Sequence, residues 1–334
     1  MGSEGATETS EASRSAAASS ATVGRLLVIT AAVMWSSSGF FAKSPLFDWS
    51  PDERGPLLAF WRAAFASLIL ALLVRRPRWS WGLIPMSVLF VAMNYTFLTA
   101  LVRTEASVVI WLQHLAPAWV LIGGRLLFGE PVQRIDLLLI GFCVTGVAVI
   151  LGDQLRGQDP ISVMLGLASG LTYAGVVLSL RRLRDLDPAW LATANHLVTA
   201  VAFLPFAIAC DQPPHGQQWL YLIAFGMLQM GLPYLLFAIG VKRIPGNQAS
   251  ALCLLEPILV PVWVFVAWGH LVDYQPPQRS TWIGAGLILT GLSIRFVGFE
   301  LLKRRRSSGA SDPSDGRSPR ESVSQKSADE ADSH

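Results

Sequence analysis

The chain has 334 residues, of which 52% are hydrophobic and only 15% are charged, which is too apolar for an ordinary water-soluble domain. The net charge is +3, and the basic residues are spread over short segments and a tail, so the sequence indicates no nucleic-acid-binding face. The cysteines lie far apart without CxxC or Cys/His spacing, which argues against a disulfide framework and a bound metal: Cys143, Cys210 and Cys253.

The chain divides into a polar lead, a series of apolar spans and a polar tail. Residues 1–23 are rich in Ser, Ala, Thr and Glu and lack the basic start of a signal peptide, so we expect a disordered lead. Residues 303–334 begin with KRRR and are otherwise polar, which predicts a disordered cytoplasmic tail. Between them we expect ten transmembrane helices of about 20 residues each: 25–43, 56–74, 82–101, 104–124, 135–152, 160–180, 189–209, 219–241, 246–268 and 280–299.

The connections between these spans alternate in charge. Acidic residues concentrate in the odd-numbered connections, which form what we call the odd-loop face. The even-numbered connections form the even-loop face and carry most of the basic residues. Because positively charged loops of multi-pass proteins face the cytoplasm, we predict a plasma membrane protein with the even-loop face and both termini inside. The basic residues concerned are Arg75, Arg76, Arg78, Arg125, Arg134, Arg181, Arg182, Arg184, Lys242 and Arg243.

The two halves of the chain resemble one another. Aligning Pro117 with Pro257 brings further identities into register, and "VTGV" in the first half has a counterpart in "LTGL" in the second. Each half holds five spans, an odd number, so the second half has to enter the membrane upside down. Inverted repeats are typical of secondary transporters, although pores and scaffolds can also be duplicated. We predict five-helix repeats at 24–153 and 160–299.

Five segments carry a family likeness: AAVMWSSSGFFAK, FWRAAFASLILAL, LAPAWVLIGGRLLFGEPV, LLEPILVPVWVFVAWG and WIGAGLILTGL. In their order and spacing they resemble the drug/metabolite transporter superfamily, most closely its ten-helix EamA-type members. The resemblance implies an all-α integral membrane fold of ten transmembrane helices in two inverted five-helix repeats. It also implies efflux of amino acids or related small metabolites. One departure is that Gly129-Glu130 in the first repeat faces Gly269-His270 in the second.

Polar residues near the middle of the spans form a candidate substrate site. Glu256 lies roughly 15 Å inside the ninth span, and a charge at that depth costs on the order of 3 kcal/mol. Burial can keep this acid neutral, in which case it could carry a proton. Alternatively, a cation such as Arg62 can keep it ionised to bind a substrate ammonium. A structural hydrogen bond to a neighbouring helix is the third interpretation.

Four further residues join this belt as substrate or coupling candidates. Arg62 could hold a substrate carboxylate, or it could snorkel to the odd-loop face. His114 could titrate or line a cavity. Asn94 and Gln229 could hydrogen-bond a ligand. Each of them could equally be a packing residue, and we expect Asn195 and His196 nearer the interface of the even-loop face.

Pro117 and Pro257 are candidate gate or hinge residues. Each removes one backbone hydrogen bond and clashes with the preceding helical turn. In lipid the freed carbonyl needs a partner in protein or water, so a kink that faces a cavity satisfies it and provides a hinge. A static kink is the alternative.

These features favour a secondary transporter that exports small polar metabolites, such as amino acids, by alternating access, with proton coupling as one option. The sequence shows no P-loop, which argues against ATP-driven transport by this chain alone, and no HExxH or GxSxG motif of an enzyme. We expect no cofactor. The partners are a small-molecule substrate and the lipid bilayer, and the sequence does not define an oligomeric state. The alternatives are a membrane-embedded enzyme and a structural or receptor protein, and the latter predicts that no aqueous cavity lies at the belt of polar residues around Glu256.

Overall fold

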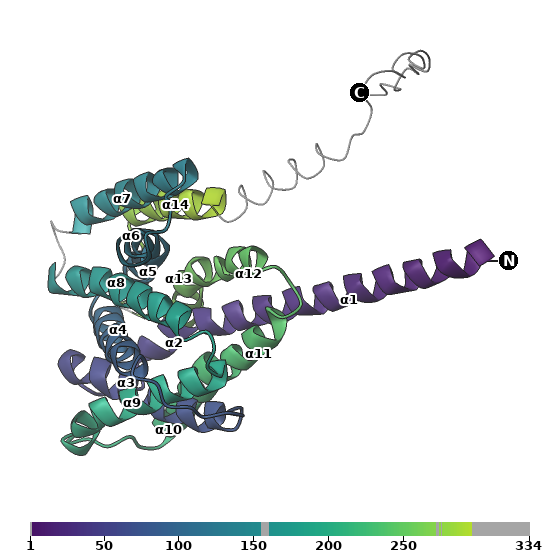
Figure 1. The fold of residues 1–334 in the computed structure, drawn as a ribbon. Coiled ribbons are helices and arrows are strands. Elements are labelled where there is room, and N and C mark those ends of the chain that lie inside the picture. Colours follow the sequence, from purple (N-terminus) through teal and green to yellow (C-terminus); the bar gives the residue numbers. More distant parts are fainter. Residues whose placement is uncertain (1, 155–159, 272–273, 275, 296–334) are drawn as a thin grey trace, which may run out of the picture.

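The structure is a computed structural model in which residues 2–154, 160–271, 274 and 276–295 are described. These residues form helices joined by short connections and contain no strand (Figure 1). The helices are α1 (Gly2–Ser36), α2 (Ser38–Ala42), α3 (Pro51–Ala71), α4 (Leu83–Arg103), α5 (Ala106–Gln113), α6 (Ala116–Phe128), α7 (Arg134–Gln154), α8 (Pro160–Arg182), α9 (Pro188–Ile208), α10 (Gln217–Gly226), the π-helix η1 (Met227–Gly231), α11 (Leu232–Gly240), α12 (Gly246–Cys253), α13 (Leu255–Trp268) and α14 (Arg279–Ser293).

The helices coincide with the predicted spans, which confirms the all-α membrane fold. Within the described residues, nine segments are long and apolar enough to cross a membrane. The tenth predicted span starts with α14 and extends beyond the described residues. The predicted tail at 303–334 lies outside the described residues. In the structure the backbone of the lead is helical from Gly2, and disorder of this segment stays a prediction. Its many alanines and glutamates are good helix formers.

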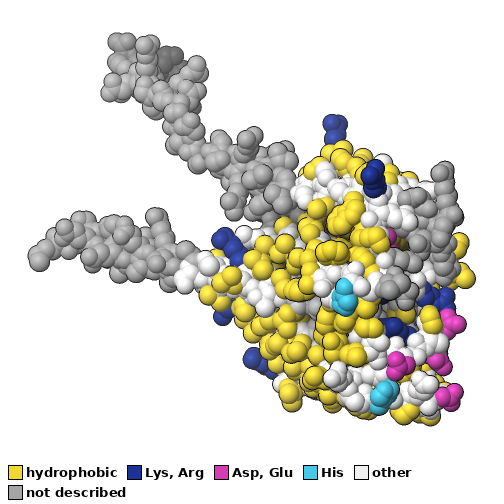
Figure 2. Space-filling model, turned by 180° about the vertical axis from the view of Figure 1, so that it is seen from behind, with side chains coloured by type: hydrophobic (Ala, Val, Ile, Leu, Met, Phe, Trp, Pro, Cys, Tyr) yellow, Lys and Arg dark blue, Asp and Glu magenta, His cyan; other side chains and the backbone are white. Residues whose placement is uncertain are grey.

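Large apolar side chains cover the outside of the bundle. Figure 2 shows hydrophobic side chains over most of the described surface on one side, with the acidic side chains gathered near one edge. Leu72 is 84% exposed, Ile208 75% and Val266 69%. A continuous apolar exterior of this kind is stable only in hydrocarbon, so the surface fits a protein that is immersed in a bilayer.

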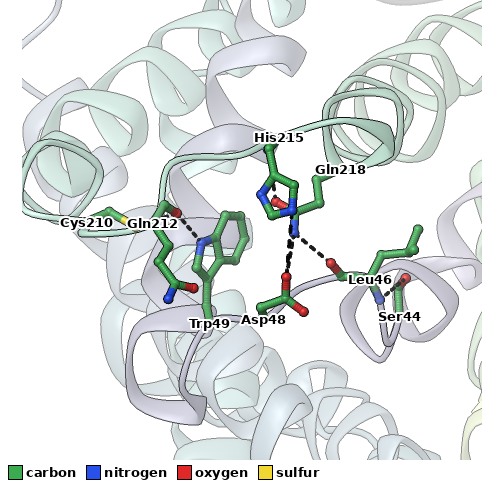
Figure 3. A network of polar contacts seen from close by, with 8 residues as sticks. All are labelled: Ser44, Leu46, Asp48, Trp49, Cys210, Gln212, His215 and Gln218. Carbon is green, nitrogen blue, oxygen red and sulfur yellow. Dashed lines mark hydrogen bonds and ion pairs between the residues drawn. The ribbon is translucent and has the colours of Figure 1, made fainter.

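On the odd-loop face, the loop before α3 binds the loop between α9 and α10 (Figure 3). The indole Nε1 of Trp49 donates to the carbonyl of Gln212 at 2.8 Å. Gln218 Nε2 donates to the carbonyl of Leu46 at 2.7 Å, and His215 lies 3.9 Å from Asp48. These contacts join a connection of the first half to a connection of the second at the same end of the bundle.

A matching clamp lies at the even-loop face. The indole of Trp190, at the start of α9, donates to the carbonyl of Arg78 in the loop after α3 at 2.8 Å. The carboxylate of Asp187 accepts hydrogen bonds from the backbone of Arg75 and Arg76 in that same loop. Trp49 lies just before the second span of the first half and binds the loop that follows the second span of the second half. Trp190 lies at the start of the second span of the second half and binds the loop that follows the second span of the first half. Two equivalent clamps at opposite ends are consistent with the inverted repeats.

The main helix–helix contacts also join the first half of the chain to the second. α3 packs on α9, and α7 packs on α14, so the second and the fifth spans of each half pair with their counterparts (Figure 1). α4 packs on α8 just as α11 packs on α1. α7 and α14 approach closely at Gly146 and Gly284, because a Cβ added to Gly284 would lie 2.5 Å from the Gly146 carbonyl oxygen. Small residues at such a crossing let two helix backbones touch.

We expect Gly284→Ala to destabilise the protein by about 1–3 kcal/mol, because the added methyl group meets backbone rather than a side chain that can move. Thermal unfolding in detergent measures the effect. Gly286→Ala on the same helix is the matched control, since nothing lies within 4 Å of its added Cβ. Equal melting temperatures for the two variants would show that this crossing is not tightly packed.

Candidate functional site

Two spans are interrupted near mid-membrane, one in each half. The fourth span changes from α5 to α6 at His114 and Leu115, and the ninth changes from α12 to α13 at Leu254. Pro117 and Pro257 both lie in the first turn of the second segment, where a missing N–H breaks no helical hydrogen bond. Each proline thus follows its break rather than causing a kink within a continuous helix. The hinge role of these prolines remains a prediction.

Arg62 on α3 is the buried cation of the bundle centre, with 2% of the residue exposed. Its Nη2 donates to Oδ1 of Asn94 on α4, and its guanidinium lies 5.2 Å from the centroid of the Phe225 ring. Asn94 is itself fixed by a 2.8 Å hydrogen bond from Nδ2 to the carbonyl of Phe90. Burial at this level excludes the snorkelling alternative for Arg62.

Glu256 lies in the first turn of α13 and is only partly buried. A carboxylate there is favoured by the free N–H groups and the dipole of the helix. Within the described residues it forms no ion pair with Arg62 within 4.0 Å, but the two groups are close enough to interact electrostatically. Glu256 also interacts electrostatically with Tyr234 and Tyr173. Acid, cation and phenols thus lie near one another without a closed salt bridge.

Tyr173, His196 and Tyr234 belong to this cluster, although the sequence analysis did not identify them as site residues. The expected interfacial place for His196 is wrong, because its side chain is fully buried between Phe90 and Tyr234, with ring centroids 4.9 and 6.1 Å away. Neither ring nitrogen has a hydrogen-bond partner in the described structure. His196 lies about 12 Å from the start of α9, so helix geometry could have predicted its depth in the bundle.

Gln229 lies beside the cluster, in the π-helix η1. Its Nε2 donates to the carbonyl of Trp35 at 2.9 Å, and the Trp35 ring lies 5.3 Å from Tyr234. π-Helical turns often occur at functional sites because they re-aim side chains. Gln229 also lines a cavity of about 270 Å³ together with six residues of the neighbouring segments: Met34, Ser37, Phe40, Phe41, Leu228 and Trp263.

His114 is placed apart from the other candidates. It lies at the break after α5, where its Nδ1 is 2.9 Å from the carbonyl of Ile110 and its ring is 6.4 Å from Trp111. The described structure shows no hydrogen bond or ion pair that links it to Arg62 or Glu256. The fold therefore brings together Arg62, Asn94 and Glu256, and Gln229 is connected to them through Trp35. His114 lies apart from this group, at the break of the fourth span.

The interrupted spans pack together at one end only. The odd-loop segments α5 and α13 are in contact, and all eight residues of α5 are buried. The even-loop segments α6 and α12 show no comparable packing in the described chain, and α6 buries only Ala116, Ala118, Val120 and Gly124. Tyr173 is 40% exposed although it interacts with Glu256. The two segments at the odd-loop face are thus packed together, whereas the two at the even-loop face lie farther apart.

Comparison with known proteins identifies the family. The profile of the EamA-like transporter family matches twice, at residues 22–152 and 160–297. The chain belongs to the EamA-like transporter family. This confirms the resemblance seen in the sequence, and the double match falls on the two halves.

Individual relatives are more distant. An uncharacterized transporter of Archaeoglobus fulgidus is 27% identical over 200 residues, which are 60% of this chain and 70% of the relative. The uncharacterized transporter YxxF of Bacillus subtilis is 25% identical over 211 residues, or 60% and 67% of the two chains. A biotin transporter of Escherichia coli is 24% identical over 44% of this chain and 50% of its own. One crystal structure superimposes with a TM-score of 0.60 at 19% identity, covering 85% of this chain and 99% of that one, and supports the fold alone.

We expect Asn94→Ala to destabilise the protein by about 2–4 kcal/mol, because it removes the hydrogen-bond acceptor of a buried guanidinium. Asn94→Asp keeps an oxygen at this position and should restore much of the loss. Thermal unfolding in detergent compares both variants with Tyr95→Phe, which changes an exposed neighbour on α4. If Asn94→Ala melts like Tyr95→Phe, the contact with Arg62 does not support the fold.

Proposed function

We propose that this protein is a secondary transporter of the plasma membrane that exports a small polar metabolite, such as an amino acid, by alternating access. The observation that carries the proposal is the pair of interrupted spans, which pack together at the odd-loop face and separate at the even-loop face. Membership of a transporter family supports it. Partial exposure of Glu256 also favours it over a structural or receptor protein, because that alternative predicts dry packing around this acid.

In this proposal Glu256 is the coupling group and Arg62 its counter-charge. When the acid is ionised, it binds a substrate ammonium or a proton that comes from the even-loop side. When Glu256 is neutral, the field of Arg62 is uncompensated and favours an anionic group of the substrate. Tyr234, Tyr173 and Trp35 provide aromatic walls on which an organic cation or an apolar part of the substrate can pack.

Glu256→Gln should abolish accumulation driven by a pH gradient in proteoliposomes while the protein still folds, because the amide cannot release a proton. A thermal-shift screen of the amino acids and biotin selects the labelled probe. Glu130→Gln is the matched control, since Glu130 is an exposed acid paired with Arg181 at the even-loop face. Normal pH-driven transport by a folded Glu256→Gln protein would refute the coupling role.

The proposed orientation places the even-loop face and both termini in the cytoplasm. A cysteine at Asp211 should react with an impermeant thiol reagent added to intact cells, whereas a cysteine at Arg125 should react only after permeabilisation. Both positions are exposed and lie on opposite faces of the bundle. The reverse pattern would overturn the orientation, and the native cysteines are replaced by Ser in both proteins.

A further inference from the structure

Glu105, a buried carboxyl at the odd-loop face, has no part in the proposed substrate site. It is the N-cap residue of α5 and only 6% exposed. Ser107 Oγ donates to its Oε1, and the backbone N–H of Gln278, the N-cap of α14, donates to the same carboxyl group. One side chain thus ties the interrupted fourth span of the first repeat to the last span of the second.

One cation and one phenol, from two further segments, interact with this carboxyl. Lys43, just after α2, interacts electrostatically with Glu105, and its Nζ donates to the carbonyl of Val102 at 3.1 Å. Tyr274 also lies within electrostatic range of Glu105. The described charged groups next to these residues are Arg54, which interacts with Lys43, and the Asp52–Arg103 ion pair at the ends of α3 and α4. The ends of α2, α4, α5 and α14 therefore meet around Glu105.

An apolar plug lies where α5 and α13 pack together. Ala106, Val260 and Val264 surround Gly39, since a Cβ added there would lie 2.7 Å from Val264, 3.1 Å from Val260 and 3.6 Å from Ala106. All three residues are buried. Glu105 directly precedes Ala106, so a movement of α5 away from α13 would also shift the Glu105 carboxyl relative to Lys43 and Gln278.

We propose that Glu105 is a second proton-binding site of this protein, which stabilises the closed odd-loop face when it holds a proton and favours opening when it is ionised. The proposal rests on the proposed function only in that it treats the plug as a gate of the transport cycle.

The pH range over which Glu105 would act is set by its pKa in the closed form and in the open form. Burial raises the pKa of Glu105 in the closed form to about 7, against the opposing hydrogen bonds of Ser107 and Gln278 and the charge of Lys43. In the open form the hydrated acid returns toward its ordinary value of 4.5. The closed form therefore binds the proton more tightly, so this stabilisation is complete below the lower value and is lost as the pH rises through the upper one. Burial lowers the pKa of Lys43 only to about 8, so Lys43 stays charged in both forms across this window.

The experiment measures the opening of the plug by cysteine labelling. Val264→Cys is the buried reporter, in a protein whose cysteines 143, 210 and 253 are replaced by Ser. An impermeant thiol reagent is added to sealed vesicles on the side that labels the exposed reporter Asp211→Cys. The ratio of the two labelling rates removes the effect of pH on the thiol itself. We expect this ratio to rise by more than about tenfold from pH 5 to pH 7.5, and to stay low and flat with Glu105→Gln.

Two variants complete the test. Glu53→Gln changes an exposed acid on the same face and should keep the rise. Lys43→Gln removes a cation that favours the ionised acid and should move the rise to higher pH, which decides the matter if Glu105→Gln does not fold. A flat ratio with Glu105 present, or a rise that survives Glu105→Gln, would overturn the proposal. Labelling requires no substrate, so a failure of the Glu256 transport assay leaves this result independent.

Discussion

The structure depends on placing two interrupted helices in a bilayer without leaving polar backbone groups in hydrocarbon, where each would cost several kcal/mol. At the first break the N–H of Leu115 bonds the carbonyl of Leu112 at 3.3 Å, and at the second the N–H of Leu254 bonds the carbonyl of Ala251 at 3.2 Å. Gly170 of α8 permits close packing at the first break, since a Cβ there would lie 2.6 Å from the Leu112 carbonyl. A tight turn therefore supplies a hydrogen bond at each break, and a glycine lets α8 pack closely on the first one.

The sequence was sufficient to predict the spans, because their length and polarity respond to one simple quantity, the thickness of hydrocarbon. It also indicated both breaks through Pro117 and Pro257, although it did not show that each helix restarts at its proline. The helical backbone from Gly2 was not expected, since a polar Ala/Ser/Glu segment has a composition that suits both a helix and a disordered lead. The helix pairs, such as α3 with α9, could not be read from spacing.

The sequence predicted less of the candidate site than of the fold. Distance along a helix predicts the depth of a side chain, and Arg62, Asn94 and Glu256 were found in this way. Which neighbour a side chain faces depends on helix rotation and packing, and this separated His114 from the group. Tyr173 and Tyr234 gave no signal in the sequence, because a tyrosine in an apolar span is equally suited to packing or to a cavity wall.

Glu256 and Glu105 occupy different electrostatic situations. Glu256 is partly exposed and interacts electrostatically with the Arg62 guanidinium, so a proton or a substrate there changes the charge of the whole cluster. Glu105 lies at the closed end, held by hydrogen bonds from two repeats, so its charge is disfavoured only while the end stays closed. A carrier must never open both ends at once. If the two acids are hydrated in different conformations, ionisation of each acid favours a different conformation, and this helps to keep one end closed while the other is open. Glu256 and Glu105 need no continuous chain of side-chain contacts between them to influence one another. α5 and α13 each extend from a helix break to the plug, so a movement of either helix affects both regions.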